Sequence, residues 1–357
     1  MKKLPPKRPA ICLAIVYAVI SVASIGSGMG TPQFARQTKL PCSACHSHVP
    51  LLNEFGQKFY ANGFRLDKSH KTYDTVPLWA TFSAQGATTP GSKTVPISYD
   101  DSEIASYGAF QPEGLLYHFE FFPTTNNVAA YGIKSFGSHF AVSAGNINTM
   151  SQYDPGLDIT LSTPVYLAPA PTGPNNSLQG PFSPGGSLMG VRLSGSTDSA
   201  LPYGQGWQVA ATVPFSNEIG NAPGFDTTEM ARGVYLETFH RQGMNSIGLN
   251  SFAGEDGRHY YGAVVQQKVG SMFFEGGGGY ANGFGDQTHV YSLSADWVPI
   301  FDKALAFRVD SQDGVLSFVP TASWELARHH SALRLVVESV LSRGIQPTST
   351  FLLQLHF

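Results

Sequence analysis

The sequence is poor in charge and, after its first segment, in long apolar runs. Only 13% of its 357 residues are charged, which is about half of the roughly 25% found in typical soluble domains. After the N-terminal segment, no apolar stretch approaches the about 20 residues that a membrane-spanning helix needs. This composition argues against an ordinary soluble enzyme and a helical membrane protein. It leaves strands as the means of entering a membrane.

Motifs of common enzymes and of nucleic-acid binding are also absent. There is no P-loop, metalloprotease motif or nucleophile triad, and no basic patch for nucleic acid; the formal net charge is −3. The glycine-rich stretch EGGGGYANGFG at 275–285 is not followed by a helical pattern, so a dinucleotide-binding loop is not predicted there. The strand period resumes at His289.

Residues 1–31 have the order of a secretory signal peptide. Four basic residues precede an apolar run from Ala10 to Ile25, and small residues follow. An uncleaved membrane anchor is the alternative, but the run is shorter than a typical spanning helix. We expect cleavage between positions 23 and 31 and export from the cytoplasm.

Cysteine is scarce, and its positions are informative. Cleavage of the signal peptide removes Cys12, so the mature chain keeps only Cys42 and Cys45. Together with His46 they form C-x-x-C-H, the pattern of covalent c-type haem attachment. The two thiols would each bond one vinyl group of a single haem c, and His46 would be the axial ligand of the iron.

Two other interpretations of this motif remain open. Zinc is one, because Cys42, Cys45, His46 and His48 are four suitable ligands within seven residues. Such close spacing would strain a tetrahedron, and no second ligand pair follows. A redox disulfide is the other, although the sequence shows no thioredoxin-like frame around the pair. Haem attachment is the preferred interpretation.

Residues 32–74 form the predicted monohaem segment. Pro50 can occupy a first helical turn, Leu52, Phe55 and Phe59 recur with helical spacing, and 62–63 is Asn-Gly, a stop signal. A piece of about 40 residues rarely folds without a staple, which a covalently bound porphyrin would supply. His48 is too close to His46 to reach the opposite face of the iron, so His70 is the candidate distal ligand.

From about residue 75 to 357 the pattern changes to strands. Apolar and polar residues alternate in short segments separated by turn residues. The C-terminal segment shows this clearly, since Phe351, Leu353, Leu355 and Phe357 alternate up to the last residue. A soluble β-sandwich would also alternate, but with more surface charge. We therefore predict an outer-membrane barrel with its apolar face towards lipid and its polar face towards a lumen.

About sixteen antiparallel strands are predicted. They are 76–88, 103–111, 114–122, 127–135, 138–147, 186–195, 205–215, 231–241, 244–254, 257–268, 271–281, 287–298, 303–310, 314–327, 330–341 and 348–357. An even count places both ends of the barrel in the periplasm, with the longer, odd-numbered connections outside. The long connections 148–185 and 216–230 have that parity. A lumen of this size has room for a small folded insert, so the haem segment is expected as a plug in the lumen or at the periplasmic side.

The N-terminal region also resembles a known family. The stretch Phe34–Phe64 is similar to the start of the fused monohaem cytochrome c–porins, outer-membrane proteins of the iron-oxidase type. The likeness rests on Ala35-Arg36-Gln37-Thr38, Cys42–His46, Pro50, Leu52-Asn53, Phe55-Gly56 and Asn62-Gly63. It implies haem thioethers at Cys42 and Cys45, an axial His46, and electron flow from extracellular Fe(II) to a periplasmic c-type cytochrome or similar carrier.

Three functions follow as hypotheses. The first is an iron(II) oxidase, in which acidic residues near the first outer connection (Asp100, Asp101 and Glu103) attract the cation. The second is a general electron-transfer porin with another donor or acceptor. The third is a transport porin with a structural haem plug, suggested by polar positions expected to face inward (Lys134, Arg192, Arg308 and Arg334).

Overall fold

A computed structural model describes most of the strand region and the segment around the cysteines. The described residues are 33–49, 51–66, 78–92, 94–99, 102–110, 114–124, 127–148, 159, 187–216, 233–255, 257, 259–282, 288–328, 331–342 and 347–356. Several predicted features lie outside them: the signal peptide at 1–31, Pro50, His70, Asp100, Asp101 and Phe357. Among the described residues, no helix is long and apolar enough to cross a membrane.

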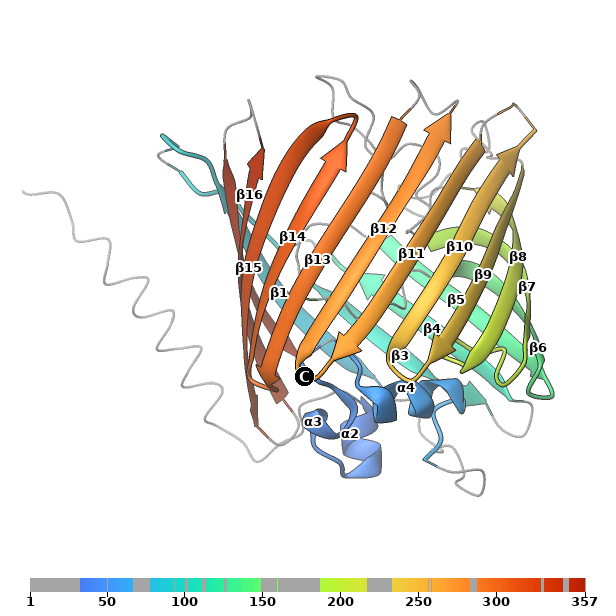
Figure 1. Ribbon diagram of the computed structural model, residues 1–357. Helices are drawn as coiled ribbons and strands as arrows, with labels where there is room; N and C mark the ends of the chain where they lie inside the picture. Colours follow the sequence, from blue (N-terminus) through green and yellow to red (C-terminus); the bar gives the residue numbers. More distant parts are fainter. Residues whose placement is uncertain are drawn as a thin grey trace, which may run out of the picture.

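The strands form one closed antiparallel barrel (Figure 1). The long strands are β1 (Trp79–Thr88), β3 (Glu103–Phe110), β4 (Leu115–Phe122), β5 (Asn127–Phe136), β6 (Phe140–Asn148), β7 (Ser187–Ser196), β8 (Gly206–Ser216), β9 (Gly233–Gln242), β10 (Asn245–Gly254), β11 (His259–Val269), β12 (Met272–Asn282), β13 (Thr288–Ile300), β14 (Lys303–Gln312), β15 (Val315–Arg328), β16 (Ser331–Ser342) and β17 (Thr348–His356). The barrel closes where β1 pairs with β17 on one side and with β3 on the other. The sixteen predicted strands are confirmed, each end within three residues. A two-residue strand, β2 (Ile97–Ser98), was not predicted.

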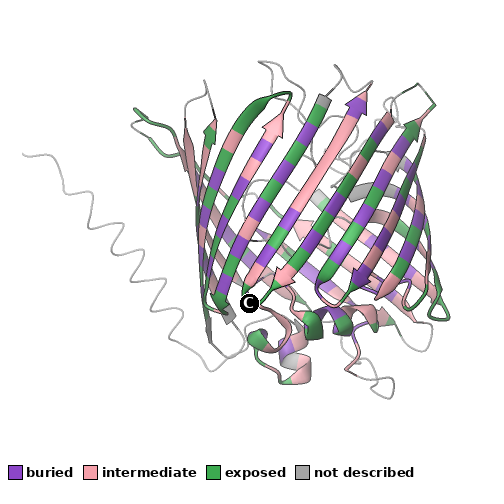
Figure 2. Cartoon of the chain, viewed as in Figure 1, coloured by how far each residue is buried: buried purple, intermediate pink, exposed green. Residues whose placement is uncertain are grey.

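The wall is apolar outside and polar inside, which is the reverse of a soluble sandwich. In β10, Ile247 and Leu249 are 54% and 58% exposed, whereas Ser246 and Asn250 are buried. The stripes of alternating burial in Figure 2 run along the strands in this way. Exposed apolar residues recur around the wall, as expected of a surface that contacts lipid.

The lumen contains paired charges. Arg192 on β7 donates to Glu237 on β9 at 2.8 Å, and Arg308 on β14 donates to Asp310 at 2.9 Å. Arg334 is also buried. The inward placement of Arg192, Arg308 and Arg334 is therefore confirmed. Buried charges of this kind are tolerable when they are paired and hydrogen-bonded.

One predicted position of a charged residue was wrong. Lys134 has the opposite parity from Tyr131 and Ile133, whose side chains pack inside the barrel, so it lies on the outer face near the end of β5. A lysine can be accommodated there because its long stem reaches the polar edge of the membrane. Glu103 is the first residue of β3, as the predicted strand 103–111 has it, and it pairs with Thr81 of β1.

The connections divide the barrel into two ends. Tight turns at 137–139, 243–244, 270–271 and 301–302 lie at one end, which we call the short-turn end. The two long connections predicted to be extracellular belong to the other end and fall largely outside the described residues. One tight turn, at Asp313-Gly314, also belongs to that other end, so the expectation of longer odd-numbered connections is wrong at this position.

Three short helices lie at the short-turn end (Figure 1). They are α2 (Gln33–Thr38), α3 (Cys42–Cys45) and α4 (Glu54–Ala61). We call the described residues 33–49 and 51–66 the plug. Its own aromatic cluster consists of Phe34, Phe59, Tyr60 and Phe64, with Phe34 stacked on Phe64 at 4.7 Å between ring centroids.

The predicted helix start in the plug was wrong. We expected Pro50 in the first turn, but α4 begins at Glu54 because Asn53 caps it and accepts a hydrogen bond from the Gly56 amide at 3.0 Å. Phe59 is buried as expected, whereas Phe55 is 43% exposed. The predicted stop is confirmed: the helix ends at Ala61, Asn62 is its C-cap, and Gly63 has the positive φ of a helix terminator.

Candidate functional site

The cysteine motif forms one helical turn with a closely packed neighbour. Cys42 and Cys45 lie three residues apart in α3, so their side chains leave the same side of the turn. The His46 amide donates to the Cys42 carbonyl at 3.0 Å, and the His46 backbone then becomes extended. The structure therefore brings the three predicted haem residues together in one local unit.

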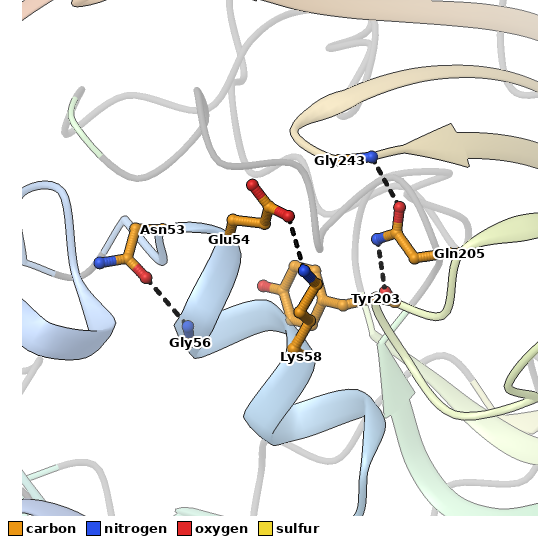
Figure 3. Close-up of polar contacts among 7 residues, drawn as sticks. All are labelled: Asn53, Glu54, Gly56, Lys58, Tyr203, Gln205 and Gly243. Carbon is orange, nitrogen blue, oxygen red and sulfur yellow. Dashed lines mark hydrogen bonds and ion pairs between the residues drawn. The ribbon is translucent and has the colours of Figure 1, made fainter. Parts of the chain in front are cut away.

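Asn53 and Gly56 fix this unit against α4. The Asn53 amide donates to the Cys45 carbonyl at 2.8 Å, and its side chain donates to the Ala44 carbonyl at 3.0 Å. A Cβ at Gly56 would clash with the Cys45 carbonyl oxygen, so only glycine permits this approach. Figure 3 shows Asn53 and Gly56 at the start of α4. Sequence reasoning did not identify these roles, although Asn before an acidic residue is a helix-start signal.

The thiols have the properties of buried groups instead of reactive ones. Both cysteines are free of a disulfide, and Cys42 is buried. Burial raises the pKa of the Cys42 thiol, with a smaller contribution from the charge of Glu325, and burial raises the pKa of Cys45 to about 11. Catalytic Cys-x-x-Cys thiols have lowered pKa values, so the raised pKa values expected from burial do not favour the redox-pair interpretation.

His48 docks the plug to the barrel. Its Nδ1 contacts the Phe301 carbonyl oxygen at 2.8 Å, in a turn of the short-turn end, and its Nε2 contacts the Ser323 hydroxyl on β15 at 2.7 Å. The side chain is fully buried, and that burial lowers the pKa of His48, which favours the neutral ring. A neutral ring donates from Nδ1 to the carbonyl and accepts at Nε2 from the serine.

The contacts of His48 bear directly on the zinc interpretation. Both ring nitrogens are used by the barrel, so neither is available to a metal. Within the described part of the chain, no group of three or more His, Cys, Asp or Glu side chains could hold a metal ion. The geometry therefore does not favour a four-ligand zinc site in this motif.

Leu51 is the apolar counterpart of His48. It is fully buried and packs in a cluster with Met244, Phe273 and Val298 from three parts of the barrel and with Ile159. Ile159 belongs to the connection between β6 and β7, and its carbonyl accepts from Arg334 at 3.4 Å. The plug therefore lies at the short-turn end of the barrel, and its side chains also pack inside the lumen.

A second anchor lies on α4. The Tyr60 hydroxyl contacts the Tyr131 hydroxyl on β5 at 2.9 Å, and the Tyr60 ring packs edge-on against Tyr203 at 5.4 Å between centroids. The Ser199 hydroxyl donates to the Ala61 carbonyl at 2.9 Å. Figure 3 shows Tyr203 beside Gln205, which connects this segment to the turn at Gly243.

Gln57, on α4, is one of several buried polar side chains with atoms that find no hydrogen-bond partner among the described residues. Its side chain is fully buried, and neither amide atom has a hydrogen-bond partner among the described residues. An unsatisfied buried amide costs about 1–3 kcal/mol. A polar partner from outside the chain, such as a haem propionate, would remove this cost. The turn with two free thiols, the adjacent His46 and this buried amide fit a covalent haem, whereas the candidate distal ligand His70 lies outside the described residues.

Comparison with known proteins identifies the class of barrel. No family model and no curated protein matches the chain. Among solved structures, a loop-deletion mutant of OmpT from Vibrio cholerae has a TM-score of 0.54 at 10% identity, covering 79% of this chain and 98% of that one. The anion-selective porin from Comamonas acidovorans has a TM-score of 0.53 at 14% identity, with the same coverage.

These similarities show the fold. The chain is a bacterial outer-membrane β-barrel of the sixteen-stranded porin type. Short turns of such barrels face the periplasm, so the short-turn end is the periplasmic mouth. The plug lies against this mouth through His48, and Leu51 and Tyr60 also contact residues on the inside of the barrel.

Proposed function

We propose that the protein is an outer-membrane electron-transfer porin, in which a haem c joined to Cys42 and Cys45 occupies the plug at the periplasmic mouth. One observation carries the proposal: a C-x-x-C-H turn with unpaired thiols is docked through His48 and Leu51 to the mouth of a porin-type barrel. When bound, the haem supplies a one-electron Fe(III)/Fe(II) couple. A periplasmic c-type cytochrome or similar carrier would reach it from the open periplasmic side.

The position of the plug limits how an extracellular donor could deliver electrons to the haem. The hydrocarbon layer is about 30 Å thick, so a donor at the outer surface would be far from a haem at the periplasmic mouth. A small donor that enters the polar lumen avoids this separation. Fe(II) is the donor that the N-terminal resemblance implies, and its charge suits a polar lumen whose inner face carries the partly exposed Glu103 of β3.

The test mixes haem-loaded ferric protein with Fe(II) under anaerobic conditions and follows the absorbance bands of reduced haem. Prompt reduction by Fe(II) is expected. A second sample in lipid vesicles, with a soluble monohaem cytochrome c trapped inside, should show reduction of the trapped protein when Fe(II) is added outside. Reduction by dithionite without reduction by Fe(II) would remove the iron assignment and leave the electron-transfer porin. A protein with no covalent haem would refute both.

A transport porin with a structural haem plug is the second candidate. The fold likeness supports this reading more directly than electron transfer, because the similar structures include an anion-selective porin. The inner face of the wall also carries the buried arginines Arg192, Arg241, Arg308 and Arg334, of which Arg192 and Arg308 are paired with carboxylates. Conductance in planar bilayers distinguishes the two. A large conductance that is independent of haem redox state, with anion selectivity in a salt gradient, would favour transport.

A further inference from the structure

A histidine in the lumen wall is oriented by a carboxylate beside the plug. His118 and Glu120 lie on β4 on the face opposite Phe119, which is 40% exposed on the outside. Nε2 of His118 lies 2.9 Å from Oε1 of Glu120, and the two side chains are 14% and 20% exposed. The pair therefore faces the lumen, buried enough to be held in place and open enough to be reached.

The hydrogen bonds decide which nitrogen is available. An ionised carboxylate only accepts, so Nε2 of His118 carries the proton and donates it to Glu120. The Tyr107 hydroxyl on β3 donates to the same oxygen, Oε1, at 2.5 Å and holds the carboxylate in place. In the neutral ring, Nδ1 of His118 is the nitrogen with the lone pair, and within the described part of the chain it makes no hydrogen bond. A histidine fixed by a carboxylate in this way is the usual arrangement of metal-binding imidazoles.

Aromatic packing fixes the ring on both sides. His118 packs against Tyr107 at 4.2 Å and stacks on Tyr131 at 4.6 Å between centroids, with 24° between the planes in the second pair. Tyr131 is also the residue that bonds Tyr60 of the plug. Tyr131 therefore contacts both the His118 imidazole and Tyr60 of the plug.

Negative charge lies on the Nε2 side of the ring, where Glu120 is bonded. Glu103 lies on β3 with the same parity as Tyr107 and acts electrostatically on it. One imidazole nitrogen oriented by a carboxylate suits a divalent transition-metal cation that retains most of its water, and does not suit an anion.

We infer that His118, oriented by Glu120, is the first protein ligand of a divalent transition-metal cation in the lumen, beside the plug. The inference rests on the proposed function, because Fe(II) is the cation that the plug would meet there. With one imidazole nitrogen as its protein ligand, this is a weak substrate site, and Tyr107 and Glu120, which hold the ring from its Nε2 side, are positioning residues.

The test measures Zn(II) binding to the haem-loaded protein in detergent by calorimetry, since Zn(II) has the same charge and no redox chemistry. The wild-type protein should bind one equivalent that His118→Ala lacks. Glu120→Gln should weaken that binding by about 10- to 100-fold. His139→Ala, which changes an exposed histidine bonded to the Ser196 carbonyl at the periplasmic mouth, is the matched control and should bind as the wild type does.

The outcomes separate this inference from the proposed function. If Fe(II) fails to reduce the haem while Zn(II) binding still depends on His118, the site stands and the function falls. If Fe(II) reduces the haem, Zn(II) should inhibit that reaction in the wild type and not in His118→Ala. Unchanged Zn(II) binding in His118→Ala, in a variant whose circular dichroism shows an intact barrel, would overturn the inference, as would a wild type that binds no Zn(II).

Discussion

The barrel wall and the plug are specified by different kinds of information. In the wall, each residue faces lipid or lumen according to its parity along a strand, and β10 shows this with Leu249 at 58% exposure beside a buried Asn250. In the plug, α4 has eight residues and α3 has four. Helices this short are marginal in isolation, and both depend on contacts made far away in the chain.

The difference shows where stability comes from in each region. Wall strands are stabilised by neighbours that pair along their whole length, as β14 and β15 do over ten residue pairs. The plug has only a small aromatic cluster of its own. Its other buried contacts are made with the barrel, through His48, Leu51 and Tyr60. We therefore expect substitutions in the plug to undock it while the barrel persists.

The largest expected effect is the loss of covalent haem from the double variant Cys42→Ser, Cys45→Ser. Thioether bonds require both sulfurs, and no wall strand uses a cysteine. Protein made in a host that matures c-type cytochromes should lose its haem stain on denaturing gels, with an unchanged β-sheet spectrum. Ser43→Ala, at an exposed position between the two cysteines, is the control and should keep the stain. A stained double variant would contradict covalent attachment.

The next effect is on docking of the plug. Leu51→Ala removes most of a fully buried side chain, which costs about 2–5 kcal/mol at typical buried sites. Hydrogen exchange should become faster at the Asn53 amide, which donates to Cys45, while wall amides stay protected. Phe55→Ala, at a 43% exposed position of the same plug, should change exchange little. Equal effects of the two variants would mean that Leu51 is not an anchor.

The wall should respond to charge according to depth in the bilayer. Leu249→Arg places a guanidinium near the middle of β10 on the lipid face, at an expected cost of about 2–4 kcal/mol. Val269→Arg is the matched control: it is 55% exposed but lies at the periplasmic end of β11, where the cost falls to about 0–1 kcal/mol. Denaturant unfolding from lipid vesicles measures both. Similar losses of stability at the two positions would contradict a bilayer whose middle lies at the level of Leu249 and whose periplasmic edge lies at the level of Val269.

Most of the wall could be predicted from the sequence because its rule is local. Alternation over ten residues gives both the strand and its face, so all sixteen segments and the inward Arg192, Arg308 and Arg334 were predicted correctly. Lys134 was the exception among the charged positions expected inside. It lies on the outer face because Tyr131 and Ile133, which have the opposite parity on β5, pack inside the barrel.

The plug could be predicted only in part, for a physical reason. C-x-x-C-H is a local signal, and so is the helix stop at Asn62-Gly63. The docking contacts are not local, since His48 reaches Phe301 and Ser323, more than 250 residues away. The triad of Tyr107, His118 and Glu120 was also missed, because it forms only when two strands bring their inward faces together.

The rate at which the plug thiols are labelled should depend on pH. In protein made without haem, Cys45 has a pKa of about 11 against an ordinary 9.0 because it is buried, so its thiolate fraction at pH 8 falls about 100-fold. Burial is the larger cause of this shift and the charge of Cys42 the smaller, so iodoacetamide labelling of Cys45 in the Cys42→Ser variant should still be slower than after urea unfolding. The labelling rate should rise with pH, since deprotonation produces the nucleophile. Fast labelling at pH 8 would indicate a reactive redox cysteine.

The smallest effect concerns the hydroxyl pair that joins plug and wall. Tyr60→Phe removes the contact with Tyr131 at 2.9 Å but leaves the ring against Phe64 and Tyr203. A single hydrogen bond contributes about 0.5–1.5 kcal/mol net, so plug docking should weaken by that amount. Tyr131→Phe should cause a similar loss, and the double variant should lose little more, because both changes remove the same bond. Fully additive losses would mean that the hydroxyls act separately and that apolar packing and His48 hold the plug instead.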